Sequence, residues 1–228
     1  TDIPLRVIED EASARGAPLH RMGVEWIASR EAEHLVFDGV RRFPLPGLLG
    51  PHQIANAGLA IACIDKLDEF KVGDEAIAQG LRYVDWPARL QRLTSGPLID
   101  ALPGGWELWL DGGHNAAAGE TLAAVAADWA EAPLYLVFGM LDSKEPAAFL
   151  RPLVARIEAL HAIAIPGEEA SLSADAAATA AKNLGIVAAP AEDVDAAIAT
   201  ISANATARGR ILICGSLYLV GQVLAENA

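Results

Sequence analysis

Residues 105–115 read Gly-Trp-Glu-Leu-Trp-Leu-Asp-Gly-Gly-His-Asn, and an alanine-rich stretch with helical character follows them. An apolar run that ends in an aspartate and passes through two glycines into a helix is typical of the strand-to-helix turns of α/β proteins. Ligands of open α/β sheets bind beyond the carboxyl ends of the strands, where such turns lie. The stretch therefore predicts an α/β fold with a ligand site near Asp111.

The side chains of this turn suit a phosphate group or a reacting carboxylate. Gly112 and Gly113 permit a tight turn and a close backbone approach. Asn115 is placed to cap the next helix, whose first N–H groups favour an anion, and His114 precedes it. From the pattern alone, Asp111 is equally a ligand-binding residue or a buried aspartate that caps the turn, and both interpretations stay open.

Composition excludes several classes of function. The 228 residues include 17 basic and 30 acidic side chains, a formal net charge of −13. We expect such a surface to repel nucleic acid and anionic membranes, and neither a membrane span nor a signal peptide is expected in this chain. Cys63 and Cys214 lie far apart in apolar patterns. They are predicted to be buried free thiols of a cytoplasmic protein, with no disulfide and no zinc site.

The apolar pattern changes near residue 93. Before it, strands are predicted within 26–40 and helices over 52–67 and 72–84, and residues 85–92 are expected to be a linker. After it, strands and helices alternate, which is typical of βαβ units and a mostly parallel sheet. The strands are expected at 98–102, 106–110, 134–139, 161–165 and 210–214, and the helices at 116–129, 146–157, 173–184, 193–207 and 217–224.

Five short motifs occur in a fixed order along the chain. They are Leu-Pro-Gly-Leu-Leu-Gly-Pro-His-Gln-Ile-Ala-Asn-Ala at 45–57, Trp-Pro-Ala-Arg-Leu-Gln at 86–91, Leu-Asp-Gly-Gly-His-Asn at 110–115, Phe-Gly-Met-Leu-Asp-Ser-Lys at 138–144 and Cys-Gly-Ser-Leu-Tyr-Leu-Val-Gly at 214–221. Each motif alone is weak, but five in order at sensible separations form a strong signal. Together they resemble the folylpolyglutamate synthase/dihydrofolate synthase family of the Mur ligase superfamily, over nearly the whole chain.

The resemblance implies a domain organisation. The family opens with a P-loop domain, and no Gly-x-x-x-x-Gly-Lys-[Ser/Thr] motif occurs here. Residues 1–87 are therefore expected to be the C-terminal portion of the central ATP-binding Mur ligase domain. Residues 88–228 are expected to be the small Rossmann-like C-terminal domain with a mostly parallel sheet. The magnesium ligands are expected in the absent N-terminal part, so the chain should hold no metal and should be inactive alone.

The resemblance also implies a reaction and its substrates. A folate or dihydropteroate carboxylate takes the γ-phosphate of ATP, and the α-amine of L-glutamate attacks the resulting acyl phosphate. The expected partners are these small molecules, without nucleic acid or membrane, and the expected state is a monomer. A Mur-type peptidoglycan ligase fragment and a non-catalytic α/β binding module remain alternatives, and the choice between dihydropteroate and reduced folates stays open.

Three residues match the family's nucleotide-binding positions. Asn56 lies in the His-Gln-x-x-Asn motif, and its amide can both donate and accept, which suits a base edge. Arg89 falls where the family's Pro-Gly-Arg segment directs an arginine to the ATP phosphates. Here Ala88 replaces the glycine, and alanine tolerates positive φ poorly. Asp111 matches an aspartate that contacts the nucleotide.

Three further residues match positions near the reacting groups. His114 is implied to contact glutamate or the transferring phosphoryl group, and Lys144 to balance phosphate or a substrate carboxylate. Ser216 follows the last strand, where its hydroxyl is equally suited to capping a helix or to contacting glutamate. We therefore predict catalytic roles for His114 and Lys144, and substrate binding by His114 and Ser216.

Overall fold

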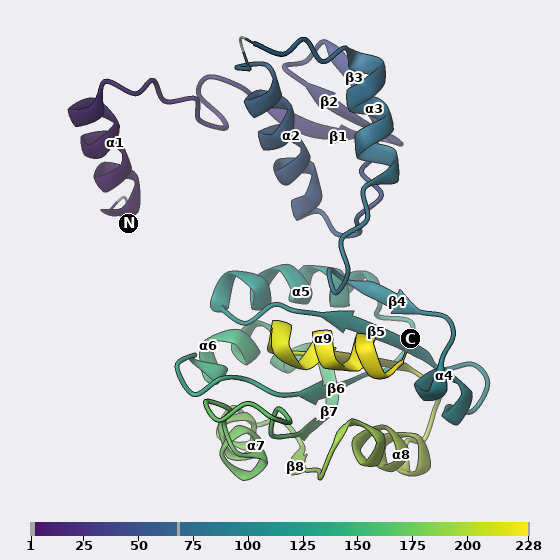
Figure 1. The fold of residues 1–228 in the computed structure, drawn as a ribbon. Helices are drawn as coiled ribbons and strands as arrows, with labels where there is room; N and C mark the ends of the chain where they lie inside the picture. Colours follow the sequence, from purple (N-terminus) through teal and green to yellow (C-terminus); the bar gives the residue numbers. More distant parts are fainter. Residues whose placement is uncertain (1–2, 68, 228) are drawn as a thin grey trace. The chain divides into compact units, whose positions relative to one another are not determined.

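The computed structural model describes residues 3–67 and 69–227 of the chain. It divides into two compact units (Figure 1). Unit 1 comprises Thr1–Gly47 and His52–Asp85, and unit 2 comprises Leu48–Pro51 and Trp86–Ala228.

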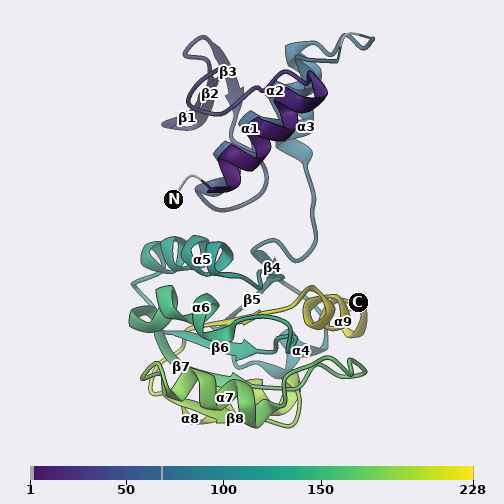
Figure 2. The same ribbon diagram turned by 90° about the vertical axis from the view of Figure 1, so that its left-hand side faces the viewer.

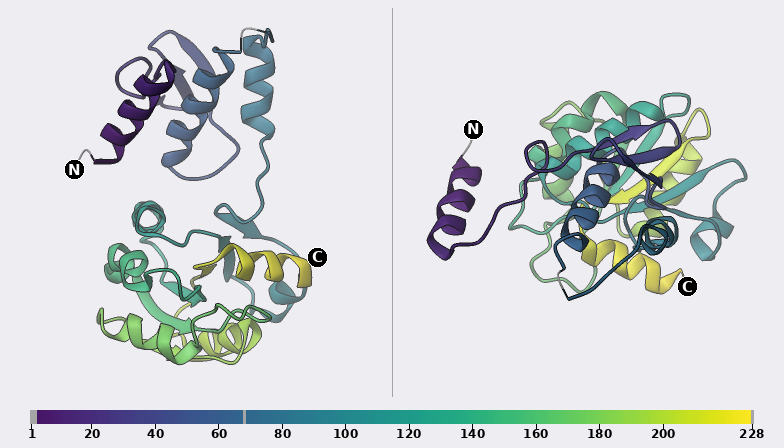
Figure 3. Two further views of the ribbon diagram at one scale, coloured as in Figure 1. Left: turned by 60° about the vertical axis from the view of Figure 1, so that its left-hand side comes forward. Right: turned by 90° about the horizontal axis from the view of Figure 1, so that it is seen from above.

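Unit 1 combines a small antiparallel sheet with helices. Its elements are α1 (Ile3–Arg15), β1 (Ala28–Glu31), β2 (His34–Phe37), β3 (Arg41–Pro44), α2 (His52–Ile64) and α3 (Asp74–Tyr83). The strands pair in the order β1-β2-β3, and α2 packs on β1 while α3 packs on β3 (Figure 3). A turn at Asp38-Gly39 joins β2 to β3, and both of its residues have positive φ. The strands, α2, α3 and the segment before β1 enclose a core that includes Trp26, Leu35, Phe37, Phe43, Ile61 and Ile77, whereas α1 has no buried residue.

Unit 2 contains a six-stranded sheet in the order β4-β5-β9-β6-β7-β8, in which only the β4–β5 pair is antiparallel. The strands are β4 (Gln91–Leu93), β5 (Glu107–Asp111), β6 (Leu134–Phe138), β7 (Ile157–Ala162), β8 (Ala188–Pro190) and β9 (Arg210–Cys214). The helices are α4 (Pro97–Ala101), α5 (Ala116–Asp128), α6 (Pro146–Leu150), the 3₁₀ helix η1 (Arg151–Arg156), α7 (Ala174–Lys182), α8 (Val194–Asn204) and α9 (Leu217–Glu226).

Helices cover both faces of this sheet (Figure 2). Successive strand residues point to opposite faces, so each central strand contributes to two cores. In β9, Leu212 packs with α5, α6 and α7, whereas Ile211 and Ile213 pack with α8 and α9. Strands buried on both faces explain the continuous apolar runs that the sequence shows. The mostly parallel α/β architecture is confirmed.

Several element boundaries differ from the sequence prediction. Residues 98–102 were expected to be a strand, but Pro97–Ala101 forms the short helix α4. Pro97 suits the first position of a helix because its missing N–H needs no partner there. The Leu98 N–H instead donates to Asn227 Oδ1 at 3.0 Å, a contact across the sequence that no local pattern reveals.

Three strands also differ from the sequence prediction. The edge strand β4 begins within the segment expected to be a linker, and the edge strand β8 was not predicted. Strand β7 ends at Ala162, whereas the predicted strand began at His161. β4 and β8 have three residues each, too few for an alternating pattern to emerge. The expected helix over 146–157 is divided into α6 and η1.

The two cysteines lie in different environments. Cys214 is buried at the end of β9, as predicted, whereas Cys63 is exposed on α2, which corrects that part of the prediction. Cys63 lies on the solvent side of a helix whose buried stripe includes Ala57, Ile61 and Ala62. The apolar composition of the helix concealed which face is outside.

We expect limited proteolysis to cleave first between α3 and β4. Asp85, Trp86 and Pro87 are exposed there and belong to no helix or strand. The exposed backbone of such a segment reaches a protease more readily than the sheet of unit 2 does. Mass spectrometry of the first fragments would locate the cut. Early cleavage within residues 130–220 instead would contradict the domain division at residues 87 and 88, which remains a proposal.

Candidate functional site

A pocket of about 250 Å³ lies at the carboxyl edge of the unit 2 sheet. The ends of β5, β9 and β6 are level here, because Asp111 and Phe138 both pair with Cys214. The loops that follow these three strands therefore converge. The residues that line the pocket are His114, Leu141, Lys144, Gly215, Ser216, Leu217 and Tyr218. Three residues predicted from the sequence, His114, Lys144 and Ser216, are thus brought together.

His114 is half-buried, and its Nδ1 atom lies 3.2 Å from the carbonyl oxygen of Gly112. A carbonyl can only accept, so this hydrogen bond requires the proton on Nδ1. In the neutral ring, Nε2 is then left as a hydrogen-bond acceptor. The local backbone therefore selects the tautomer of a histidine that lines the pocket.

Lys144 and Ser216 add donors to the same pocket. Lys144 is half-buried, and its ammonium group makes no ion pair or hydrogen bond with other residues in the described part of the chain. Ser216 is 3% exposed, and its Oγ accepts a hydrogen bond from the N–H of Tyr218 at 3.1 Å, which caps α9. The hydroxyl hydrogen of Ser216 remains able to donate, so capping the helix and contacting a ligand are compatible.

Asp111 is buried and holds two backbone segments together. Its Oδ1 accepts from the N–H of Gly113 at 2.7 Å, and its Oδ2 accepts from the N–H of Leu90 at 2.9 Å. These contacts match the turn-capping interpretation. A nucleotide contact by Asp111 stays a prediction. Burial, together with the neighbouring Asp111 carboxylate, raises the pKa of the Cys214 thiol well above its ordinary value, so this thiol is inert.

Gly113 is required by this arrangement. A Cβ atom at this position would lie 2.8 Å from Asp111 Oδ1 and 2.7 Å from the Cβ of Ala118. The absence of a side chain therefore allows the aspartate to fold back onto the turn. Asn115 caps α5 as predicted, because its Oδ1 accepts from the N–H of Ala118 at 2.9 Å.

Arg89 lies in a turn that Asp111 contacts. We call residues Ala88, Arg89 and Leu90 the arginine turn. Ala88 has φ +60° and Leu90 has φ +47°, a left-handed conformation that costs about 1–2 kcal/mol for each non-glycine residue. Ala88 thus adopts the positive φ that alanine tolerates poorly, at the position where the family has glycine. Such strain persists only where contacts impose it, and it is common at functional sites.

The guanidinium of Arg89 has no hydrogen bond or ion pair with other residues in the described ranges, although the residue is half-buried. By contrast, Arg92, three residues further along the chain in β4, forms an ion pair with Glu107 at 3.1 Å. The chain has a strong excess of acidic side chains. Under these conditions an arginine that pairs with no other described residue is a good candidate for binding an anion.

Asn56 lies in unit 1, on α2. Its side chain is exposed, and its Nδ2 donates to Oε1 of the buried Gln53 at 3.0 Å. This contact fits a network at the start of the helix. A nucleotide contact by Asn56 remains a prediction.

Sequence reasoning overlooked Gln91, the first residue of β4. Its Oε1 accepts from the N–H of Ala88 at 2.9 Å. The residue stands at the end of the Trp-Pro-Ala-Arg-Leu-Gln motif at 86–91, which was the available signal.

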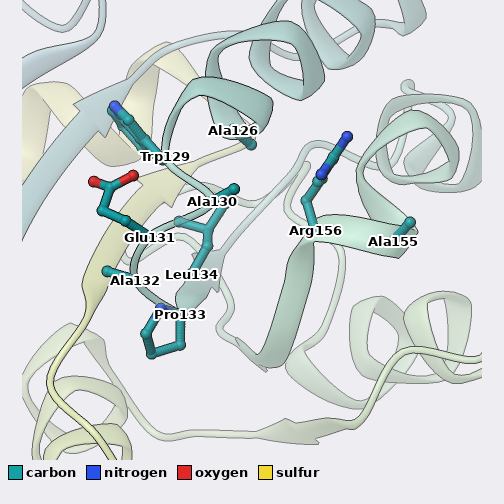
Figure 4. A pocket seen from close by; sticks show the side chains of 9 residues that line it. All are labelled: Ala126, Trp129, Ala130, Glu131, Ala132, Pro133, Leu134, Ala155 and Arg156. Atoms are coloured by element: carbon teal, nitrogen blue, oxygen red, sulfur yellow. The ribbon is translucent and has the colours of Figure 1, made fainter.

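A second cavity of about 280 Å³ lies where α5 leads into β6, at the opposite end of that strand (Figure 4). Trp129 and Glu131 line one side and Arg156 another. Arg210, on β9, pairs with Glu131 and stacks on Trp129 at 5.2 Å from the ring centre. None of the residues predicted from the sequence to act in a site lines this cavity.

Among residues 3–67 and 69–227, no group of three or more His, Cys, Asp and Glu side chains is arranged to hold a metal ion. Within the same ranges, no helix has the length and apolar character needed to cross a membrane.

A mostly parallel sheet with helices on both faces and a polar pocket beyond its carboxyl ends defines a domain of the doubly wound α/β class. The family model described as "Dihydrofolate synthetase, C-terminal domain" matches residues 103–226. The chain therefore belongs to this family, and the resemblance seen in its motifs is confirmed.

Individual relatives agree with this assignment. A dihydrofolate synthase/folylpolyglutamate synthase of Bacillus subtilis is 26% identical, with 96% of this chain and 51% of the relative covered. The structure of Escherichia coli FolC in complex with DHPP and ADP has a TM-score of 0.78 at 26% identity, with 96% of this chain and 50% of that chain covered. The chain thus spans about half the length of these relatives.

A further solved structure bears on the ligands. It is a bifunctional folylpolyglutamate synthase/dihydrofolate synthase with Mn, AMPPNP and L-glutamate bound. Its TM-score is 0.75 at 28% identity, with 96% of this chain and 50% of that chain covered.

Proposed function

We propose that the chain is part of an ATP-dependent ligase that joins L-glutamate to the carboxylate of a folate or of dihydropteroate. The observation that carries the proposal is the pocket lined by His114, Lys144 and Ser216 at the carboxyl edge of the sheet. The family membership and the ligands named for the related structures support it.

The reaction proceeds in two steps in this proposal. A carboxylate oxygen of the folate attacks the γ-phosphorus of ATP, ADP leaves, and an acyl phosphate forms. The α-amine of glutamate then attacks the acyl carbon and loses a proton, an amide bond forms, and inorganic phosphate leaves. The protein accelerates both steps mainly by positioning the reactants and by stabilising developing negative charge.

The pocket suits glutamate and the acyl phosphate. The Lys144 ammonium and the Ser216 hydroxyl donate to a carboxylate or a phosphoryl oxygen. His114 Nε2, an acceptor in the neutral tautomer, receives a hydrogen bond from the attacking amine. The first N–H groups of α9, next to Ser216, favour the same negative charge.

The nucleotide is assigned to other residues. We propose that the Arg89 guanidinium binds ATP phosphate oxygens through its two-pronged fork. Asp111 accepts from ribose hydroxyls in this assignment, and Asn56 contacts the base. Arg89 is supported by a guanidinium that pairs with no other residue of the described ranges, and Asp111 by its place at the end of β5.

The proposal includes Mg²⁺ as the metal, a monomeric state and a cytoplasmic location. The first two follow from the family resemblance and the third from two free cysteines. No donor cluster for a metal occurs in the described ranges, so no step here is assigned to Mg²⁺.

The direct test is an activity assay of a form of the protein that spans the full length of its relatives. Purified protein with ATP and L-glutamate should release ADP and form a glutamyl product only when dihydropteroate or a reduced folate is added. Separate incubations with the two acceptors identify the substrate. A protein that binds ATP but forms no glutamyl product with either acceptor would fit the non-catalytic binding module instead.

Replacing Lys144 by methionine in that full-length form should raise the KM for glutamate or lower kcat by about tenfold. The methionine keeps the length of the side chain but removes a charge-assisted hydrogen bond to the substrate. Steady-state kinetics would measure the effect. Lys182→Met is the matched control, because Lys182 is exposed in the last turn of α7 and should have no effect. Equal kinetics for the two variants would remove Lys144 from the site.

A further inference from the structure

The arginine turn has a backbone that its own sequence does not favour. Ala88 and Leu90, on either side of Arg89, both have positive φ, and both are only 4% exposed. Neither residue is a glycine, so the left-handed conformation has to be imposed by contacts from outside the turn.

Three hydrogen bonds impose it. The N–H of Ala88 donates to Gln91 Oε1, the N–H of Leu90 donates to Asp111 Oδ2, and the N–H of Gly112 donates to the Ala88 carbonyl, each at 2.9 Å. The backbone on both sides of Arg89 is therefore fixed by a side-chain acceptor.

The side chains of Gln91 and Asp111 both accept from the arginine turn, but they differ in their other contacts. Asp111 also binds Gly113 and so helps to shape the loop that carries His114. Gln91 Oε1 accepts from the arginine turn, and the residue pairs with Leu110 through the β4–β5 ladder. The side chain of Gln91 can therefore be altered while the ladder and the β5 loop are kept.

We propose that Gln91 is a positioning residue for Arg89. Its amide oxygen holds the N–H of Ala88 and so sets the direction in which the Arg89 side chain leaves the backbone. This inference rests on the proposed binding of ATP phosphates by Arg89. A guanidinium fork matches phosphate oxygens only in a narrow range of orientations, so a loosened turn weakens nucleotide binding even though Arg89 is intact.

The test uses a double-mutant cycle in the full-length form of the protein. Gln91→Met keeps an unbranched side chain of similar size and removes the acceptor oxygen. It is compared with Arg89→Ala, with the double variant, and with Arg92→Met as a control on the same strand. Arg92 is exposed and pairs only with Glu107 among the described residues. The measurements are the KM for ATP, the KM for glutamate and the Tm of each protein.

We expect Gln91→Met to raise the KM for ATP about three- to tenfold, the effect of losing one neutral hydrogen bond. The KM for glutamate should be unchanged, and Arg92→Met should behave as the unaltered protein. In the Arg89→Ala background, Gln91→Met should have no further effect on the KM for ATP, because its effect acts through the arginine.

Four outcomes would overturn the inference. Additive effects in the cycle would mean that Gln91 acts independently of Arg89. A lower Tm or a failure to fold, with no specific rise in the KM for ATP, would mean a general structural role. An unchanged KM for ATP in Arg89→Ala would refute the phosphate-binding role of Arg89, and this inference with it. If the KM for ATP rises in Arg89→Ala but not in Gln91→Met, only the positioning role of Gln91 is refuted.

Discussion

Replacing Arg89 by alanine in the full-length form of the protein should lower kcat/KM for ATP about tenfold to a hundredfold. A charge-assisted hydrogen bond to a phosphate contributes roughly 1.5–3 kcal/mol, and this energy converts to that loss of rate. The free energy of unfolding should change by no more than about 0.5 kcal/mol, because the Arg89 side chain bonds to no other residue of the described ranges. Kinetics and thermal melts of the same preparation measure both quantities.

Arg89→Lys should recover only part of the activity. A lysine restores the positive charge, but its single ammonium cannot reproduce two parallel hydrogen bonds to a phosphate. Arg92→Ala is the control, since it removes a neighbouring positive charge that already pairs with Glu107. Near-normal ligation by Arg89→Ala would mean that Arg89 is a solvated residue of the segment between the two units.

The helices and strands that depend on their own residues, rather than on distant contacts, could be predicted from the sequence. The long helices and the central strands β5, β6 and β9 follow from continuous apolar runs and from capping residues such as Asn115 and Ser216. The convergence of His114, Lys144 and Ser216 was also accessible, because parallel strands end at one edge of a sheet and each residue closely follows a strand.

The features that could not be predicted from the sequence depend on contacts between residues that are far apart along the chain. Leu90 and Asp111 are 21 positions apart, and the hydrogen bond between them determines both the arginine turn and the role of the aspartate. Leu98 and Asn227 are 129 positions apart, and that contact helps to hold α4 where a strand was expected. Short edge strands such as β4 are defined by their partner strand, so their own residues show little pattern.

Replacing Asp111 by alanine should lower the free energy of unfolding by roughly 2–4 kcal/mol, because the backbone N–H groups of Leu90 and Gly113 lose a charged acceptor in a buried place. The corresponding fall in Tm is roughly 5–15 °C. Asp111→Asn retains one acceptor oxygen and should lose less. Asp100→Ala, which removes an exposed aspartate from α4, should leave Tm nearly unchanged. An unaltered Tm in Asp111→Ala would contradict the turn-capping role.

The same variant separates the two roles that the sequence left open for Asp111. Assayed well below its melting temperature, Asp111→Ala should show a raised KM for ATP, because the Leu90 end of the arginine turn is released. If Asp111→Ala acted only by releasing the arginine turn, it would not raise the KM for ATP any further in an Arg89→Ala background. A further rise in the KM for ATP in that background is expected here, since we propose that Asp111 also accepts from the ribose hydroxyls. An additional effect near zero would reduce Asp111 to a residue that shapes the turn, and the nucleotide contact would have to come from elsewhere.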